Sequence, residues 1–122
     1  MGDRICIRLV DGDQRSPLFY GHWCGLRALR DMNGALRDEN NGMSNVMCNF
    51  IVRVMGGKIQ SGSYYIYSDD GTYSTMADWD NWCWTFDMRD HLWTTTFPEL
   101  SGRRMSMDEV DDYVMSNGAR IP

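Results

Sequence analysis

Residues 79–87 read Trp-Asp-Asn-Trp-Cys-Trp-Thr-Phe-Asp, and they hold three of the five tryptophans of the chain. In an extended segment, successive side chains point to opposite faces. Alternation then puts the bulky apolar side chains on one side: Trp82, Trp84, Phe86 and Met88. The smaller and polar ones fall on the other side: Asn81, Cys83, Thr85 and Asp87. We expect the first side to fill a core and the second to meet solvent or a partner.

The segments on either side of this strand predict the rest of the fold. Strand patterns and turn residues indicate a hairpin over 5–10 and 18–22, and further strands over 64–67 and 92–97. Helical spacing from Leu26 and again from Ser44 or Asn45 to Met55 predicts two consecutive helices. Ser106 and Glu109 have the spacing of a capping box, which predicts a C-terminal helix. The order predicts an α+β fold in which an antiparallel sheet of about five strands carries two central helices and a C-terminal helix.

Length and composition favour one ordinary globular domain over residues 1–122. The 122 residues are 43% hydrophobic and 24% charged, and no apolar run approaches the ~18 residues of a membrane span. The N-terminus lacks the basic and apolar segments of a secretory signal. We therefore expect a cytoplasmic protein without membrane contact.

The four cysteines lie far apart in the sequence, at positions 6, 24, 48 and 83. No two have the spacing of a metal-binding or redox pair. We interpret all four as buried free thiols, and no metal or cofactor is predicted.

The chain has a net charge of −5, and its charged residues are distributed unevenly along the sequence. Residues 1–60 carry a balance of +2, whereas residues 61–100 carry seven acidic groups against Arg89 and a balance of −6. The acidic character argues against general nucleic-acid binding, which needs clustered cations. The acidic stretch could meet a basic protein surface or a cation, or serve as a solvated face.

The sharpest polar cluster is Gly21-His22-Trp23-Cys24-Gly25, at the predicted junction of the second strand and the first helix. His22 could act as a general base or a recognition donor, with the flanking glycines admitting a ligand to the backbone. The alternative is a histidine hydrogen-bonded within the corner and packed on Trp23. An antiparallel hairpin would bring Asp3 and Arg4 near residues 22–24, where Asp3 could orient His22. A nucleophilic Cys24 is the weakest of these interpretations.

Two further features are candidates for binding. The acidic turns at 69–71 and 78–81 could hold a hard cation, although neither has the spacing of a calcium loop. Aromatic side chains could stack on a planar ligand or pack in the core: Tyr64, Tyr65, Tyr67, Trp79, Trp82 and Trp84. Core packing is the least convincing for Trp79, which lies among acidic residues.

Several of these segments, in this order, resemble a group of small uncharacterised archaeal, bacterial and viral proteins. The resemblance covers about the first 90 residues and rests on four stretches: Gly2-Asp3-Arg4, Leu18 to Gly25 with its His-Trp-x-Gly segment, Asn45 to Ile51, and Asp80 to Asp87. The group tends to have glycine where this chain has Cys24. The resemblance implies a shared fold and a shared patch, but no reaction. That patch is Asp3, Arg4, His22, Trp23, Asp80 and Asn81.

These observations favour a small non-enzymatic binding protein over an enzyme. We expect a viral or mobile-element accessory factor that sequesters a small molecule or blocks a host protein. The predicted ligand-binding residues are the shared patch together with Trp79. The alternatives are a small hydrolase or nucleotide-processing enzyme that uses His22 with Asp3, and a homodimer formed through exposed aromatics.

Overall fold

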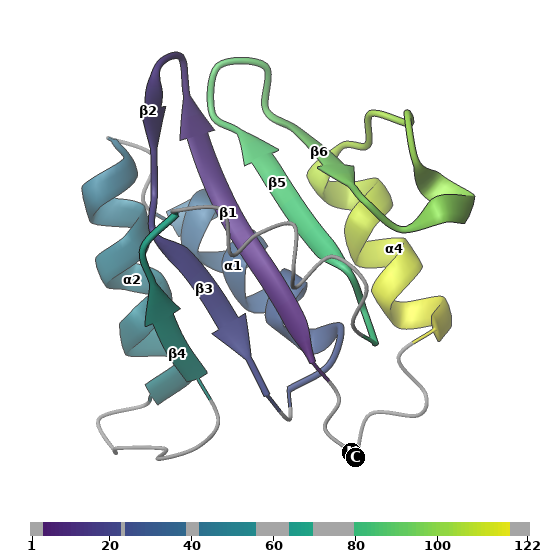
Figure 1. Cartoon of the computed structure of the whole chain (residues 1–122), viewed down its shortest axis with the longest axis horizontal. Helices are drawn as coiled ribbons and strands as arrows, with labels where there is room; N and C mark the ends of the chain where they lie inside the picture. The colour runs from purple at the N-terminus through teal and green to yellow at the C-terminus, as the bar shows by residue number, and fades with distance from the viewer. Residues whose placement is uncertain (1–3, 23, 39–41, 56–63, 70–79, 118–122) are drawn as a thin grey trace.

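The computed structural model describes residues 4–22, 24–38, 42–55, 64–69 and 80–117. Its strands are β1 (Ile5–Asp11), β2 (Gln14–Arg15), β3 (Leu18–Gly21), β4 (Tyr64–Tyr67), β5 (Cys83–Asp87) and β6 (Leu92–Thr95). Its helices are α1 (Arg27–Asp38), α2 (Met43–Met55), α4 (Met107–Asn117) and the short 3-10 helix η1 (Pro98–Leu100). The α+β class is confirmed (Figure 1).

The prediction of an antiparallel sheet of about five strands is wrong in its pairing. The sheet has six strands in the order β4-β3-β1-β5-β6, with β2 paired to β1 beside this path. Strands β1 and β5 pair in parallel, with Cys6 opposite Cys83, while the other pairs are antiparallel. Figure 1 shows β1 and β5 side by side with their arrows pointing the same way. The sheet is therefore mixed.

The parallel pair follows from where β5 enters the sheet. If the consecutive strands β4 and β5 formed a hairpin, they would be neighbours in the sheet. In the structure, β3 and β1 lie between them. In that position β5 puts Trp84 and Phe86 against the same core as Ile7 and Leu9 of β1. Burial of these apolar side chains on both central strands, rather than the shortest connection, decides the pairing.

One face of the sheet, which we call the helix face, carries the main core. The described helices α1, α2 and α4 all lie behind the sheet in the view of Figure 1. Their apolar sides pack on alternate strand residues that are at most 2% exposed: Ile5, Ile7, Leu9, Trp84, Phe86 and Trp93. Burial of two tryptophans and a phenylalanine here supplies much of the hydrophobic stabilisation, at about 25 cal/mol per Å² of apolar surface.

A buried amide ties the helix face together. Asn33 of α1 is fully buried, and its Oδ1 accepts a hydrogen bond of 2.8 Å from Trp93 Nε1. Its Nδ2 donates to the Met107 carbonyl at 3.1 Å and to Asp111 Oδ1 at 2.9 Å. Asn33 thus joins α1, β6 and α4, and its polar groups are satisfied.

The predicted helices are present. Helix α2 spans Met43–Met55, so it ends where predicted but begins before Ser44 and Asn45, the predicted start. The capping box at the start of α4 is reciprocal: Glu109 N donates to Ser106 Oγ at 3.1 Å, and Ser106 N donates to Glu109 Oε1 at 3.0 Å. Val110 and Val114 point into the core, as expected. None of the helices described is long and apolar enough to cross a membrane.

The alternation predicted for the aromatic strand breaks at Trp82. This residue has a positive φ of 65° and precedes the first residue of β5. Its ring stacks on Phe97 with centroids 6.1 Å apart, instead of continuing the row of Trp84 and Phe86. A left-handed backbone turns the side chain away from the direction that strict alternation would give it.

The opposite face of the sheet, called here the second face, carries the other alternate residues. Cys6, Leu18, Tyr20 and Cys83 form a separate buried cluster there. Register places Tyr65 and Tyr67 of β4 opposite Tyr20 and Leu18 of β3, so the two tyrosines lie on this face. Both are exposed, at 41% and 40%. The second face is therefore buried at its centre and exposes tyrosines along β4.

Candidate functional site

Arg4, Asp80 and Asn81, which are far apart in the sequence, meet at the start of β1. Asp80 Oδ2 accepts hydrogen bonds from Arg4 N at 3.0 Å and from Arg4 Nε at 3.2 Å. Asn81 donates twice to the Arg4 carbonyl, from its backbone N at 2.9 Å and its Nδ2 at 3.0 Å. These bonds also hold the segment before β5 against β1, a structural role that the sequence interpretation did not include.

The ion pair sets the protonation of Asp80. Partial burial acts to raise the pKa of this carboxyl, but the hydrogen bonds and positive charge of Arg4 outweigh it and lower the pKa below its usual value. The two side chains are 26% and 29% exposed. The pair therefore stays ionised at neutral pH and remains within reach of solvent.

Tyr20 links this pair to His22. Its hydroxyl oxygen lies 2.8 Å from His22 Nδ1, and the two rings are 5.8 Å apart. Burial raises the pKa of Tyr20, partly opposed by the positive charge of Arg4 and a hydrogen bond from it. The hydroxyl therefore stays neutral and makes hydrogen bonds with both cationic and imidazole groups.

Sequence reasoning did not select Tyr20. The signal was present, because Tyr20 and His22 are two residues apart, which places them on one face of an extended segment.

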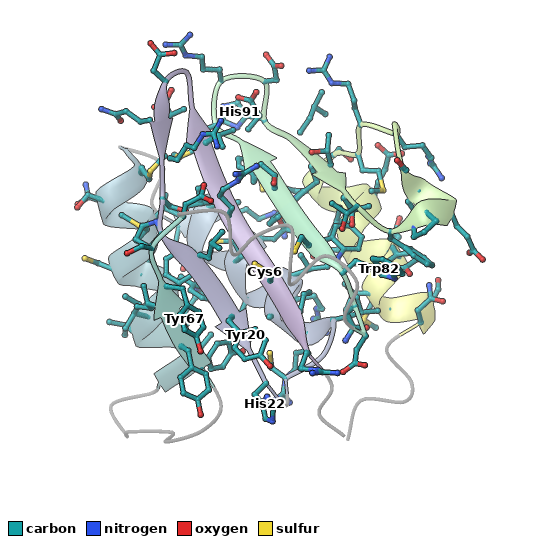
Figure 2. The ribbon with its side chains drawn as sticks, in the orientation of Figure 1. Cys6, Tyr20, His22, Tyr67, Trp82 and His91 are labelled. Atoms are coloured by element: carbon teal, nitrogen blue, oxygen red, sulfur yellow. The ribbon has the colours of Figure 1, made fainter. Side chains whose placement is uncertain are left out.

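Two exposed tyrosines complete the arrangement. Tyr65 and Tyr67 lie 5.9 and 6.0 Å from the Tyr20 ring, and their own rings stack at 6.2 Å with an interplanar angle of 24°. Figure 2 shows Tyr20, Tyr67 and His22 gathered at one end of the sheet. We name the group the Tyr20 surface, and it consists of Arg4, Tyr20, His22, Tyr65, Tyr67 and Asp80.

The glycines on either side of His22 have structural roles, which differ from the predicted role of admitting a ligand to the backbone. A Cβ on Gly21 would lie 2.0 Å from Cys24 Sγ, so the thiol fills the space that a ligand was expected to use. Gly25 has a φ of 60° and its carbonyl accepts a hydrogen bond from Ala28 N as α1 begins. The corner is thus packed around the buried Cys24.

Cysteine burial is confirmed at three positions and wrong at one. All four cysteines are free thiols, and Cys6, Cys24 and Cys83 are buried. Cys48 is exposed because it lies on the outer side of α2, with Asn45, Asn49 and Val52.

Three of the predicted site residues lie outside the described residues. These are Asp3, Trp23 and Trp79. The proposed orientation of His22 by Asp3 and its packing on Trp23 therefore stay predictions. Of the predicted patch, the structure brings together Arg4, Asp80 and Asn81, and it connects them to His22 through Tyr20.

Three of the seven acidic groups in residues 61–100 pair with arginines, and two others, Asp70 and Asp78, lie outside the described residues. Asp69 accepts from Arg8 Nη1 at 2.9 Å and lies 3.7 Å from Arg15 Nη1. Asp80 pairs with Arg4, and Asp90 with Arg104. Carboxylates of the acidic segment thus meet arginines from both ends of the chain, which weakens the prediction of an acidic docking patch. Among the described residues, no three side chains of metal-ligating type come together.

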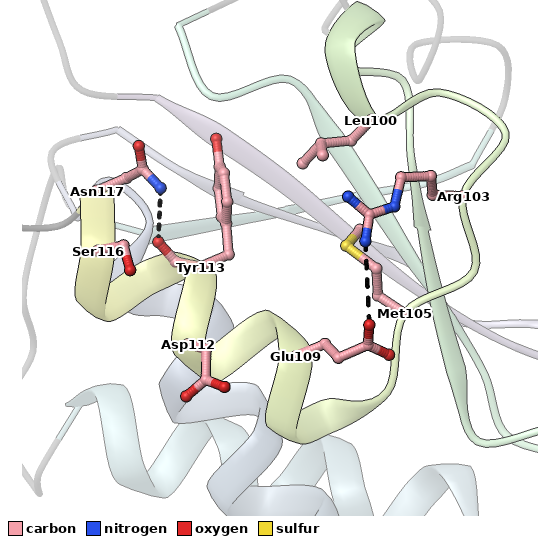
Figure 3. Close-up of a pocket in the computed structure, with 8 residues that line it drawn as sticks. All are labelled: Leu100, Arg103, Met105, Glu109, Asp112, Tyr113, Ser116 and Asn117. Carbon is pink, nitrogen blue, oxygen red and sulfur yellow. Dashed lines mark hydrogen bonds and ion pairs between the residues drawn. The ribbon is translucent and has the colours of Figure 1, made fainter.

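A hollow of about 290 Å³ lies elsewhere, between α4 and the segment after η1 (Figure 3). Arg103 and Glu109 face each other across it at 4.0 Å, and Asn117 Nδ2 donates to the Tyr113 carbonyl at 2.9 Å. None of the predicted site residues lines it. Arg103, Glu109 and Asn117 already make polar contacts within its lining, so the Tyr20 surface is the better candidate site.

Comparison of the chain with models of protein families, with curated proteins and with solved structures finds no match. The resemblance described above therefore stays a prediction, and the function must be argued from the geometry.

Proposed function

We propose that the protein is a small non-enzymatic binding protein that uses the Tyr20 surface to sequester a small ligand or block a host protein. In this proposal it acts in the cytoplasm, as an accessory factor of a virus or mobile element. The observation that carries the proposal is the position of Tyr20, which contacts His22, Tyr65 and Tyr67 and lies beside Arg4.

The exposed tyrosines support recognition. A tyrosine ring supplies a large, rigid contact area and a polar hydroxyl while losing little side-chain entropy on binding. Tyr65 and Tyr67 are about two-fifths exposed and already stacked, so they are ordered before a partner arrives. Rings of this kind contribute roughly 1–3 kcal/mol for each planar group stacked on them.

The contact of the Tyr20 hydroxyl with His22 Nδ1 supports a recognition role for the imidazole. In a hydrolytic triad, a buried carboxylate stabilises the imidazolium that forms when histidine takes a proton. The hydrogen-bond partner found at His22 Nδ1 is the hydroxyl of Tyr20, whose pKa is raised by burial. A neutral hydroxyl orients the ring without supplying that negative charge. The rival enzyme would need Asp3 in this role.

Thermal-shift measurements with a panel of mononucleotides and dinucleotides, together with capture of partners from a host lysate, test the proposal. We expect the wild type to bind at least one of these probes, with binding lost in Tyr67→Ala and weakened in His22→Ala. Met115→Ala is the matched control, because Met115 is a 63% exposed apolar residue on α4.

Two results would count against the proposal. If the wild type shows no thermal shift and captures nothing, binding loses its support. If a nucleotide is turned over by the wild type and not by His22→Ala, the enzyme is the better interpretation.

A further inference from the structure

Strand β4 forms one end of the described sheet and exposes apolar side chains on both of its faces. In the strand order it pairs only with β3. Tyr65 and Tyr67 are exposed on the second face, and Ile66 is 52% exposed on the helix face. These are three of the five large hydrophobic residues exposed in the described part of the chain.

The strand also lacks the features that keep sheet edges from pairing. Natural edge strands are commonly protected by charged side chains, proline or a bulge. Tyr64–Tyr67 reads Tyr-Tyr-Ile-Tyr, without charge, proline or glycine. Within the described sheet its outer edge has no strand partner, so that edge can accept another strand through backbone hydrogen bonds.

From this edge we propose that the protein forms a homodimer in which β4 pairs antiparallel with β4 of a second copy around a two-fold axis at Ile66. The pattern Tyr65-Ile66-Tyr67 reads the same in both directions. A two-fold axis at Ile66 thus places Tyr65 of each copy opposite Tyr67 of the other, both on the second face. On the helix face, Ile66 meets its own equivalent. Aromatic pairs in direct cross-strand positions stabilise a sheet.

Charge at this edge does not oppose a second copy, whose identical Tyr65-Ile66-Tyr67 pattern complements it. The chain has a net charge of −5, which would oppose self-association through a charged surface. The β4 edge is neutral, and the nearby Asp69 is paired with Arg8 and Arg15. Pairing of two identical copies here therefore brings no unpaired carboxylates of Asp69 together.

The contact is short, so the dimer depends on concentration. A four-residue strand buries less surface than the ~1,200 Å² at the lower limit of stable interfaces. The pairing continues the second face from one copy to the next, and it brings the two Tyr20 surfaces onto one side of a joined sheet.

Sedimentation velocity over low micromolar to millimolar concentrations tests the dimer. The average mass of the wild type should rise from 14.1 kDa towards about 28 kDa, twice the chain. Ile66→Lys should stay at 14.1 kDa, because two lysines would face each other across the axis. Met115→Lys, at a site on α4 that is at least as exposed as Ile66, should associate like the wild type.

Hydrogen exchange provides a second readout that does not rely on one variant. Amides of β4 should exchange more slowly as the wild-type concentration rises, and those of Ile66→Lys should not change. A wild type that stays monomeric overturns the proposal, even if the edge binds another protein. A dimer that Val52→Lys disrupts and Ile66→Lys does not would place the interface on α2 and also overturn it.

Discussion

The two faces of the same sheet differ in what their alternate residues do. On the helix face, Ile7, Leu9, Trp84 and Phe86 are at most 1% exposed beneath the helices. On the second face the central Tyr20 is buried, while Tyr65 and Tyr67 are exposed beside it. The helix face thus carries the larger buried core, and the second face carries, beside a small buried cluster, the exposed groups able to recognise a partner. Variants on the two faces should separate stability from binding.

The largest effect is expected at Trp84. Replacing this fully buried ring with alanine removes its packing on the helix face and the 2.7 Å hydrogen bond from Nε1 to the Asn81 carbonyl. We expect Trp84→Ala to lower the free energy of unfolding by about 3–5 kcal/mol, as for other large core truncations. Tyr67→Ala on the second face should cost at most about 1 kcal/mol. Urea denaturation of both variants measures the difference, and equal losses would contradict the division between the faces.

Asn33 is the polar exception on the helix face, and its removal should have the next largest effect. Asn33→Ala leaves the buried Trp93 Nε1 without its acceptor and breaks both bonds to α4. Each buried polar group left unsatisfied costs about 1–3 kcal/mol, so we expect a loss of roughly 2–3 kcal/mol. Asn45→Ala, at an exposed position on α2, is the control and should change stability by only a few tenths of a kcal/mol. Similar losses of unfolding free energy in the two variants would show that the hydrogen bonds of Asn33 make no special contribution to stability.

Tyr20→Phe sharpens the comparison on the second face. The ring keeps its packing against Tyr65 and Tyr67, while the hydroxyl loses its hydrogen bonds with His22 Nδ1 and Arg4. We expect a loss of about 1 kcal/mol in stability and a change in the NMR chemical shifts of the His22 ring. Unchanged ring shifts would mean that the hydroxyl does not hold the imidazole.

The smallest effect is expected at Asp80 and should depend on pH. Its folded pKa lies below the usual value, so the ionised carboxylate stabilises the folded state at neutral pH, and this contribution disappears as the pH falls through the folded pKa. Asp80→Asn should therefore be less stable than the wild type at pH 7, by less than about 1 kcal/mol because solvent screens the pair. The difference should shrink as the pH is lowered from 7 through the folded pKa of Asp80. Urea midpoints at pH 7 and along an acidic pH series test it, and a difference that does not shrink in acid would exclude the ion pair as its cause.

Local features were predictable from the sequence, and pairing over long distances was not. The reciprocal bonds of Ser106 and Glu109 and the span of α2 follow from residues within a few positions of each other. The parallel pair of β1 and β5 joins residues more than 70 positions apart, and alternation carries no information about a strand's neighbour. The positive φ of Trp82 could not be predicted either, because a tryptophan side chain gives no indication of that backbone conformation.

The candidate site was predictable in its parts. Arg4, His22, Asp80 and Asn81 were selected for their chemistry and their resemblance, and Tyr65 and Tyr67 as aromatic candidates. What the sequence could not provide was the residue that joins them, because the contacts of Tyr20 with Arg4 and β4 depend on strand order.

The most direct test of the division between the faces is made on Tyr67→Ala, by measuring stability and binding on the same preparation. The free energy of unfolding comes from urea denaturation, and binding from quantitative capture of whatever the wild type retains from the host lysate. We predict that the variant keeps its stability within about 1 kcal/mol and loses the bound molecule, while Met115→Ala keeps both. Undiminished binding by a stable Tyr67→Ala would contradict the assignment of recognition to the second face.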